Sequence, residues 1–229
     1  MGHSEHMTDI VLSRTNGVTL LGGGGVKSAT LDVALSHAPH LVAADGAAAT
    51  ALDLGHMPEA VIGDFDSLSN RVRQNLPCEI LHHIAEQDST DFEKCLSRVD
   101  SPLIFGVGFM GERIDHELSV YNTLVRYPEK HCIIIGEVDI CLSAPRNLRL
   151  ELDIGTRVSL FPFKYVTGTS TGLLWPIDNI AFGPGGRIGT SNEASAKIVE
   201  LAFHDDGMLL ILPRRVLPNL LDALNWMTP

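Results

Sequence analysis

The segment AVIGDFDS, residues 60–67, decides the fold class, because a short apolar run ends there in a glycine and two aspartates. The run Ala60 to Ile62 follows Pro58 and has the composition of a buried strand. Asp64 and Asp66 come directly after it. In parallel sheets covered by helices, ligands bind where the strands end. The segment therefore predicts such a sheet with an acidic site at its edge.

The same alternation of apolar runs and helices extends over the N-terminal part of the chain. Strands are predicted at residues 18–21, 40–44, 60–62, 79–82, 103–107 and 132–136. Helices are predicted from Ser28, after Asp45-Gly46 to Leu54, over 91–99 and over 115–126. Strands that are almost continuously apolar and alternate with helices indicate a mostly parallel sheet covered on both faces. We therefore predict an α/β domain over residues 1–143.

The pattern changes at about Ala144. Leu148, Leu150 and Leu152 alternate with polar residues, which is typical of a strand with one buried face. Further short apolar runs lie at 158–163, 173–177, 198–203 and 208–212, separated by turn residues. Residues 144–229 are therefore predicted to form a small all-β domain, closed by a helix over 217–226.

Composition and charge exclude several classes of protein. The net charge of −11 disfavours a general nucleic-acid binder, and no apolar run is long enough to predict a membrane span. The polar N-terminus, Met1 to Thr8, is not expected to be a signal peptide. Four cysteines without a C-x-x-C pair argue against a zinc site and favour reduced thiols in a cytoplasmic protein. An acidic chain repels nucleotides unless a metal ion joins its carboxylates to the phosphates.

Asp64 and Asp66 are candidate metal ligands. In an extended chain they point to the same side, and two carboxylates about 4 Å apart repel by about 4 kcal/mol at an effective dielectric constant near 20. A divalent cation turns this repulsion into binding, and magnesium prefers a few carboxylates together with phosphates and water. The alternative is that Asp64 and Ser67 only cap a turn and the following helix.

A second acidic segment, QDSTD at 87–91, precedes the helix predicted over 91–99. Asp91 is expected to join the same metal cluster, and Lys94, one turn later, is expected to face phosphate. Ser89, Thr90 or Asp91 could instead cap the helix. The two roles are compatible, because the cap and the ligand can be different residues.

The segment GFMGERIDH at 108–116 follows another predicted strand. Arg113 can hold phosphate by paired hydrogen bonds, and Asp115 can act as a metal ligand or a base. His116 can carry a proton or orient another group. The alternative for His116 is a hydrogen-bonded, partly buried structural residue.

Glycines at two strand ends can bring the backbone close to a ligand. The run Gly22–Gly25, which includes Gly24, matches neither standard glycine-rich phosphate-binding pattern. Asp45-Gly46 could contact a ribose or a base. Both segments could equally be plain turns.

In the predicted β domain, Trp175 lies near hydroxyl-bearing residues, which suits a flat heteroaromatic ligand. Ser191 and Asn192 follow in a second polar segment. The alternatives are core packing for Trp175 and a turn at Ser191-Asn192.

Together these segments resemble those of the thiamine pyrophosphokinases, in the same order and over nearly the whole chain from Leu20. The matching segments are ADGA at 44–47, IGDFDS at 62–67 after Pro58, DSTDFEK at 88–94, GERIDH at 111–116, GLLWP at 172–176 and SN at 191–192. The combination of Gly-Asp-Phe-Asp-Ser with Thr-Asp-x-x-Lys is quite specific to that family.

The resemblance implies that ATP gives its pyrophosphoryl group to the hydroxyl of thiamine, leaving AMP and thiamine diphosphate. It implies an α/β nucleotide-binding domain followed by a β-sandwich, and a homodimer with thiamine at the subunit interface. By position it assigns Asp64, Asp66 and Asp91 as Mg²⁺ ligands and catalytic residues, with Arg113 and Asp115 beside them; Gly24, Asp45, Gly46, Lys94, Arg113 and His116 as ATP contacts; and Trp175, Ser191 and Asn192 as thiamine contacts.

The chain departs from the family pattern at two places. Some of the same segments would also suit other functions. The family usually has Gly-Gly-Arg where this chain has Gly111-Glu112-Arg113, and usually an asparagine where it has Val120, with Asn122 nearby. A pyrophosphokinase for another heteroaromatic alcohol, such as a hydroxymethylpterin, would differ only in the β domain. The second aspartate cluster argues against a sugar-nucleotide transferase, and the complete aspartate set argues against a catalytically dead thiamine-binding protein.

Overall fold

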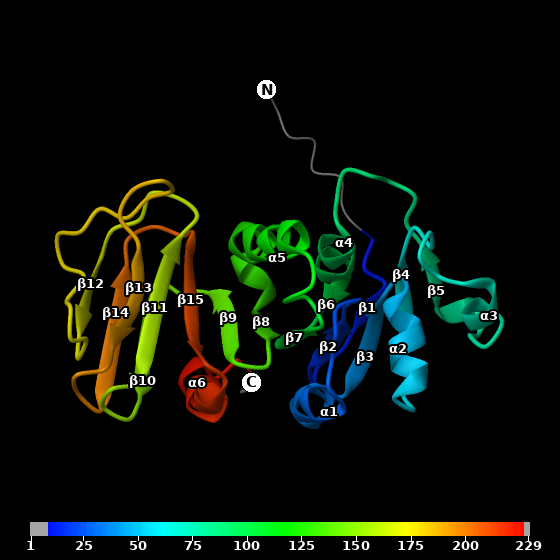
Figure 1. The fold of residues 1–229 in the computed structure, drawn as a ribbon, viewed down its shortest axis with the longest axis horizontal. Coiled ribbons are helices and arrows are strands. Elements are labelled where there is room, and N and C mark those ends of the chain that lie inside the picture. Colours follow the sequence, from blue (N-terminus) through cyan, green and yellow to red (C-terminus); the bar gives the residue numbers. More distant parts are fainter. Residues whose placement is uncertain (1–8, 227–229) are drawn as a thin grey trace.

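A ten-stranded sheet runs through the centre of the molecule, with strands from both halves of the chain (Figure 1). The computed structural model describes residues 9–226, so the polar segment Met1–Thr8 lies outside it. The strand order is β13-β11-β15-β9-β8-β7-β2-β3-β4-β5. In chain order these strands are β2 (Val18–Leu21), β3 (His40–Ala44), β4 (Ala60–Gly63), β5 (Leu81–His83), β7 (Ile104–Val107), β8 (Cys132–Ile135), β9 (Asp139–Ser143), β11 (Arg157–Pro162), β13 (Gly189–Glu193) and β15 (Met208–Pro213).

The sheet is mixed rather than parallel throughout. The strands from β8 to β5 pair in parallel, whereas those from β8 through β9 to β13 pair antiparallel. Parallel neighbours need a crossover, usually a helix, while antiparallel neighbours can be joined by a short turn such as residues 136–138 between β8 and β9. The prediction of parallel strands therefore holds for the N-terminal part of the sheet.

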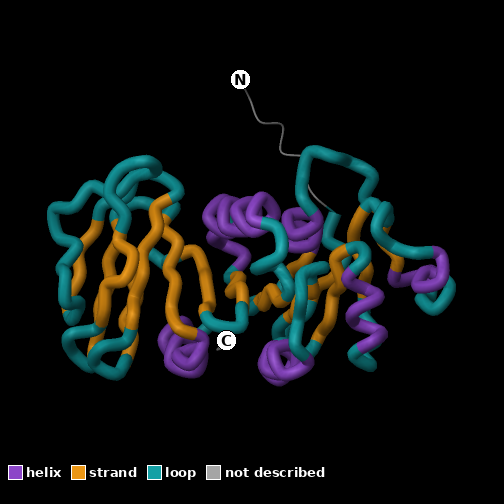
Figure 2. Tube along the Cα trace, viewed as in Figure 1, coloured by secondary structure: helices purple, strands orange, loops and turns teal. Residues whose placement is uncertain are grey.

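Helices cover both faces of the parallel strands (Figure 2). Helices α4 (Asp91–Arg98) and α5 (Ile114–Arg126) cover one face, and α1 (Ser28–His37) and α2 (Ala47–Asp53) cover the other. Leu20 and Ile62 point into the core beneath α4 and α5, while Leu21 and Val61 point into the core beneath α1 and α2. Because both faces are buried, these strands are apolar at most positions, with exceptions such as the buried Thr19 of β2, which is why the sequence pattern located most of them.

A second, three-stranded antiparallel sheet packs against the antiparallel end of the large one. It consists of β10 (Asn147–Glu151), β14 (Ile198–Phe203) and β12 (Gly168–Thr171), in that order. Leu150 and Leu201 on this sheet share one core cluster with Leu160 and Leu210 on the large sheet. Helix α6 (Leu217–Leu224) lies against β10. The remaining regular elements are β1 (Leu12–Ser13), paired with β6 (Val99–Asp100); α3 (Asn70–Arg73); and 3-10 turns at Cys78–Ile80, Pro128–Lys130 and Arg214–Val216.

Three predicted elements differ from the structure. The strand predicted at 79–82 begins as a 3-10 turn and becomes β5 only at Leu81. The apolar run at 173–177 forms a loop, because Gly172 has a φ of +73° and Pro176 cannot donate to a ladder. The last helix ends at Leu224, before Asn225 turns left-handed. No helix within residues 9–226 has the length and apolar character needed to cross a membrane.

Candidate active site

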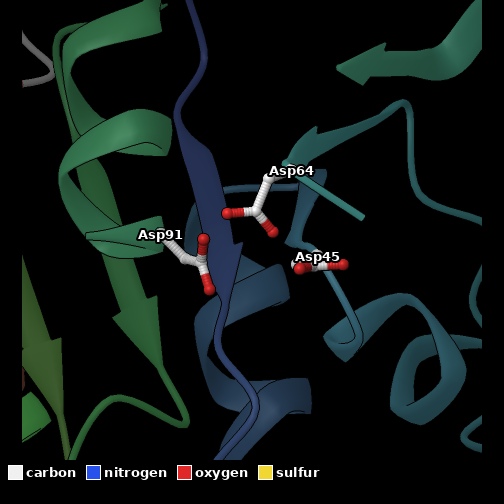
Figure 3. A group of neighbouring side chains, drawn as sticks. All are labelled: Asp45, Asp64 and Asp91. Carbon is white, nitrogen blue, oxygen red and sulfur yellow. The ribbon is translucent and has the colours of Figure 1, made fainter. Parts of the chain in front are cut away.

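Three aspartates from three elements meet at the carboxyl edge of the parallel strands (Figure 3). Asp45 follows β3, Asp64 follows β4, and Asp91 begins α4. One carboxylate oxygen from each of the three lies within 4.8 Å of the other two. A single cation can therefore contact all three, and a set of carboxylate oxygens suits a hard cation such as Mg²⁺.

Asp45 is the most buried member of this cluster. It is 2% exposed, and neither carboxylate oxygen has a hydrogen-bond partner within residues 9–226. Burial, followed by the charge of Asp91, raises the pKa of Asp45 to about 7. A buried carboxylate without a partner is costly unless a cation compensates it. The orphaned Asp45 side chain thus fits a divalent-cation site.

Glycine is required beside Asp45, because the end of β4 passes close to it. A Cβ on Gly63 would lie 2.7 Å from the Cβ of Asp45, closer than two such atoms approach. Asp45 itself has a φ of +44°, a left-handed conformation that aspartate adopts more readily than most residues. The glycine before Asp64 is therefore set by packing against Asp45.

Asp64 is held by a buried cation of the protein itself. Lys94 Nζ lies 3.0 Å from Asp64 Oδ2 and 3.7 Å from Asp91 Oδ1, and the lysine side chain is 2% exposed. Gln87 Nε2 donates a hydrogen bond to the same Asp64 oxygen at 3.0 Å. The hydrogen bond from Lys94 holds the pKa of Asp64 far below its usual range. Asp64 is consequently ionised at neutral pH.

At the start of α4, the residue that caps the helix differs from the residue that joins the aspartate cluster. Thr90 Oγ1 accepts a hydrogen bond from the backbone N–H of Glu93, so Thr90 is the N-cap. The Ser89 side chain is bonded to Glu86 instead. Asp91 is thereby left to face Asp45 and Asp64, and burial raises the pKa of Asp91 although Lys94 opposes the shift.

Asp66 lies outside the three-aspartate cluster. The expected extended geometry is absent, because Phe65 has a φ of +63° and the chain turns there. The Asp66 side chain is exposed, and its Oδ1 accepts a hydrogen bond from Ser67 Oγ at 2.9 Å. Helix α3 is capped by Ser69 rather than by Asp64 or Ser67. The structure thus places Asp45 in the cluster, and the metal-binding role of Asp66 stays a prediction.

A cavity of about 340 Å³ opens beside the cluster. Its lining brings together the predicted nucleotide residues Gly24, Asp45, Gly46, Arg113 and His116, with Asp91. Lys94 lies beneath this surface, paired with Asp64, and does not line the cavity. Asp115 is exposed at the start of α5, where its Oδ2 lies 2.7 Å from Arg113 Nη2.

A second cavity, also about 340 Å³, lies at the other end of the large sheet. Trp175, Ser191 and Asn192 line it, and Trp175 is 58% exposed. Asn192 Nδ2 donates to the backbone carbonyl oxygen of Trp175 at 2.7 Å, and Asn192 Oδ1 accepts from the backbone N–H of Trp175 at 3.2 Å. The buried Asn192 amide therefore holds the tryptophan loop in place, a role its sequence position did not indicate.

Two features of the aspartate cluster went unassigned from the sequence. Asp45 follows β3, and Asp64 follows β4, the parallel neighbour of β3. Because neighbouring parallel strands end at the same edge of a sheet, the predicted topology could have indicated that Asp45 joins the cluster. The contact of Gln87 with Asp64 joins positions 23 residues apart and has no local signal.

Comparison with known proteins supports one family. The model described as "Thiamin pyrophosphokinase, catalytic domain" matches residues 31–135, and "Thiamin pyrophosphokinase, vitamin B1 binding domain" matches residues 147–208. The chain is 31% identical to thiamine pyrophosphokinase 3 of Oryza sativa over 68% of its own length and 65% of that protein. It therefore spans slightly less than two thirds of that relative.

A bacterial relative and a solved structure agree with this match. The chain is 30% identical to thiamine pyrophosphokinase of Bacillus subtilis, over 66% of its own length and 77% of that protein. The crystal structure of thiamin pyrophosphokinase from Geobacillus thermodenitrificans superimposes with a TM-score of 0.71 at 23% identity, covering 86% of this chain and 96% of that one. The sequence matches span both halves of the chain and the structural match shares their fold, so the chain belongs to the thiamin pyrophosphokinase family.

Proposed function

We propose that this protein transfers the pyrophosphoryl group of ATP to the hydroxyl of thiamine, giving thiamine diphosphate and AMP. The observation that carries the proposal is the orphaned, buried carboxylate of Asp45, which lies in a three-aspartate cluster beside a glycine-lined cavity. Membership of the thiamin pyrophosphokinase family supports thiamine as the acceptor.

Asp45, Asp64 and Asp91 would hold Mg²⁺, with Asp66 as a further candidate ligand from the adjoining turn. When bound, the ion neutralises negative charge on the oxygens of the triphosphate, where charge develops during transfer. Lys94 keeps Asp64 ionised and so preserves a charged ligand at neutral pH. Gly24 and Gly46 line the cavity, and neither position has much room for a side chain, because a Cβ at Gly24 would lie 2.8 Å from the Gly108 carbonyl oxygen and one at Gly46 would lie 3.0 Å from Ser67.

Arg113, which also lines the cavity, would bind the transferring phosphates. Its guanidinium is exposed and is already oriented by Asp115, so it can turn towards a phosphate by exchanging one carboxylate partner for another anion. His116 lines the same cavity, from within the first turn of α5. Attack by the acceptor hydroxyl at the β-phosphorus, with departure of AMP, needs positioned charge more than covalent help from the protein.

We also propose that the active unit is a homodimer. The cavity of Trp175 lies beside the edge strand β13, seven strand steps from β3, and at about 4.8 Å per step the two sites are roughly 30 Å apart. Thiamine bound at Trp175 therefore cannot reach ATP at Asp45 of the same chain. Ile114 and Leu118, 76% and 55% exposed on α5 beside the nucleotide cavity, offer an apolar surface for a second copy.

We assign the two substrates to different parts of the chain. Residues 1–143 would act as the nucleotide-binding unit and residues 144–229 as the thiamine-binding unit, although one sheet runs through both. We further propose that the reaction takes place in the cytoplasm, where ATP is available and the free thiols of Cys95, Cys132 and Cys141 stay reduced.

Product analysis tests the activity directly. The protein is incubated with ATP, MgCl₂ and thiamine, and equal amounts of AMP and thiamine diphosphate are expected. Formation of ADP, or turnover with a hydroxymethylpterin but not with thiamine, would reject the proposed reaction. Asp45→Asn serves as the inactive control, because it removes the orphaned charge at nearly constant volume.

Mixing two impaired variants at a thiamine concentration far below the raised KM of Trp175→Ala tests the shared site. Asp64→Asn disables the nucleotide half and Trp175→Ala weakens thiamine binding in the other half, but a mixed dimer has one intact pair of halves. Co-expression of the two is expected to restore up to about half of the activity per hybrid dimer. Hybrid dimers as inactive as either parent would contradict a site built from two subunits.

A further inference from the structure

The loop that carries Arg113 is hydrogen-bonded to α5 through the carboxylate of Glu117. This residue comes directly after the segment GERIDH at 111–116 and has been given no role so far. The Gly111 N–H donates a hydrogen bond to Glu117 Oε2 at 2.8 Å, and the Tyr121 hydroxyl donates to Glu117 Oε1 at 2.6 Å. Glu117 and Tyr121 are four residues apart and therefore lie on the same face of α5. Both oxygens of Glu117 are thus engaged, one by the loop and one by the helix.

Tyr121 is itself held in place by the core. Its ring packs on the core cluster that includes Cys141 of β9 and Leu209 of β15. Burial and the neighbouring Glu117 raise the pKa of the Tyr121 hydroxyl, so it remains a proton donor. The backbone N–H of Glu117 also donates to the Arg113 carbonyl oxygen at 3.1 Å. Glu117 therefore contacts the loop at two places, through its side chain and its backbone.

The loop needs such a contact because its conformation is unusual. Gly108, Gly111 and Glu112 have φ values of +77°, +85° and +51°, and the left-handed region disfavours Glu112, which is not a glycine. The first half of the loop is packed in place, with the Phe109 ring 4.7 Å from that of Phe92. The second half, from Gly111 to Arg113, is exposed at the cavity.

We propose that Glu117, supported by Tyr121, is a positioning residue for the reaction. It holds the Gly111 amide, maintains the left-handed turn at Glu112 and thereby places Arg113 at the nucleotide cavity. Glu117 itself does not line that cavity, so it acts through Arg113. This inference depends on the proposed function, because the position of Arg113 matters to turnover only if the cavity binds ATP.

A double-mutant cycle tests the proposal. Glu117→Ala is expected to raise the KM for ATP about tenfold and to leave the KM for thiamine unchanged. In an Arg113→Ala background the same substitution is expected to have almost no further effect, because the group it positions is gone. Tyr121→Phe is expected to show a smaller increase of the same kind. Additive losses from Glu117→Ala and Arg113→Ala would overturn the proposal.

Tyr127→Phe is the matched control. Tyr127 donates its hydroxyl to Glu93 Oε1 at 2.9 Å, so it repeats the tyrosine–carboxylate contact at the far end of α5, away from the loop. Its removal is expected to change neither KM. If Glu117→Ala does not fold, Glu117→Gln, which loses the charge and one acceptor, is measured in its place.

Hydrogen exchange separates this inference from the proposed function. The amide protons of residues 108–113 are expected to exchange faster in Glu117→Ala than in the unaltered protein or in Tyr127→Phe. Unchanged exchange overturns the positioning role whatever the activity is. Faster exchange together with no formation of AMP and thiamine diphosphate by the unaltered protein would reject the proposed function and, with it, the catalytic part of this inference.

Discussion

Lys94 Nζ lies 3.0 Å from Asp64 Oδ2, and the lysine side chain is only 2% exposed. The ammonium group therefore stands inside the acidic cluster and offsets part of its repulsion, while Asp45 remains without a partner in residues 9–226. Because Lys94 is buried and Asp64 is only 16% exposed, removing the lysine leaves the charge of Asp64 uncompensated in a partly buried site.

Replacement of Lys94 with methionine, which has a similar length, is expected to lower the free energy of unfolding by about 3 kcal/mol and to abolish turnover. The measurement is urea denaturation with a chelator present. Lys27→Met is the matched control, because its ion pair with Glu137 is exposed, with Lys27 at 74%, and such pairs contribute at most about 1 kcal/mol. Equal losses in the two variants would contradict the role given to Lys94.

Asp45 is expected to make the metal-free protein less stable as the pH rises. Its pKa is raised from 3.8 to about 7, so between these values the folded chain binds a proton that the unfolded chain has released. Stability is therefore lost as the pH rises through this window. Asp45→Asn should remove the loss and be more stable than the unaltered protein at about pH 8, by at most about 4 kcal/mol.

The same pair of proteins gives the check at lower pH. With chelator present, the stability difference between them is expected to shrink at about pH 5, where Asp45 is protonated in the folded state and resembles asparagine. A difference that is the same at both pH values would show that Asp45 does not titrate in this window.

Magnesium binding should distinguish Asp45 from Asp66. Without ATP, Mg²⁺ is expected to raise the unfolding temperature of the unaltered protein and of Asp66→Asn, but not of Asp45→Asn, because only Asp45 lies in the three-aspartate cluster. Turnover is expected to be lost in both variants, since Asp66 remains a candidate ligand once the nucleotide is bound. Full activity of Asp66→Asn would remove it from the metal site.

Trp175→Ala is expected to raise the KM for thiamine at least tenfold and to leave the KM for ATP almost unchanged, because the exposed ring lines the cavity at β13 far from the nucleotide. Trp226→Ala is the matched control. Trp226 stacks on His131 with ring centroids 4.6 Å apart, outside both cavities, and its removal should affect neither KM. Equal changes in both KM values for Trp175→Ala would contradict the stacking role.

Much of the fold follows from local sequence patterns. The sequence predicts β2, β3, β4, β7 and β8 because strands buried on both faces leave nearly continuous apolar runs, and it predicts α4 and α5 because amphipathic helices leave a periodic pattern. The run at 173–177 was mispredicted as a strand because apolar content alone does not report the left-handed Gly172 that precedes it.

The sequence by itself determined that acidic residues lie where parallel strands end, since a strand and the residue after it are adjacent in the chain. Only the tertiary structure decided which of them converge. A positive φ at Phe65 turns Asp66 away, and the approach of β4 to β3 brings Asp45 against Gly63. Lys94 was expected to face phosphate but is buried against Asp64. Such contacts depend on strand order and single backbone torsions, which periodicity does not encode.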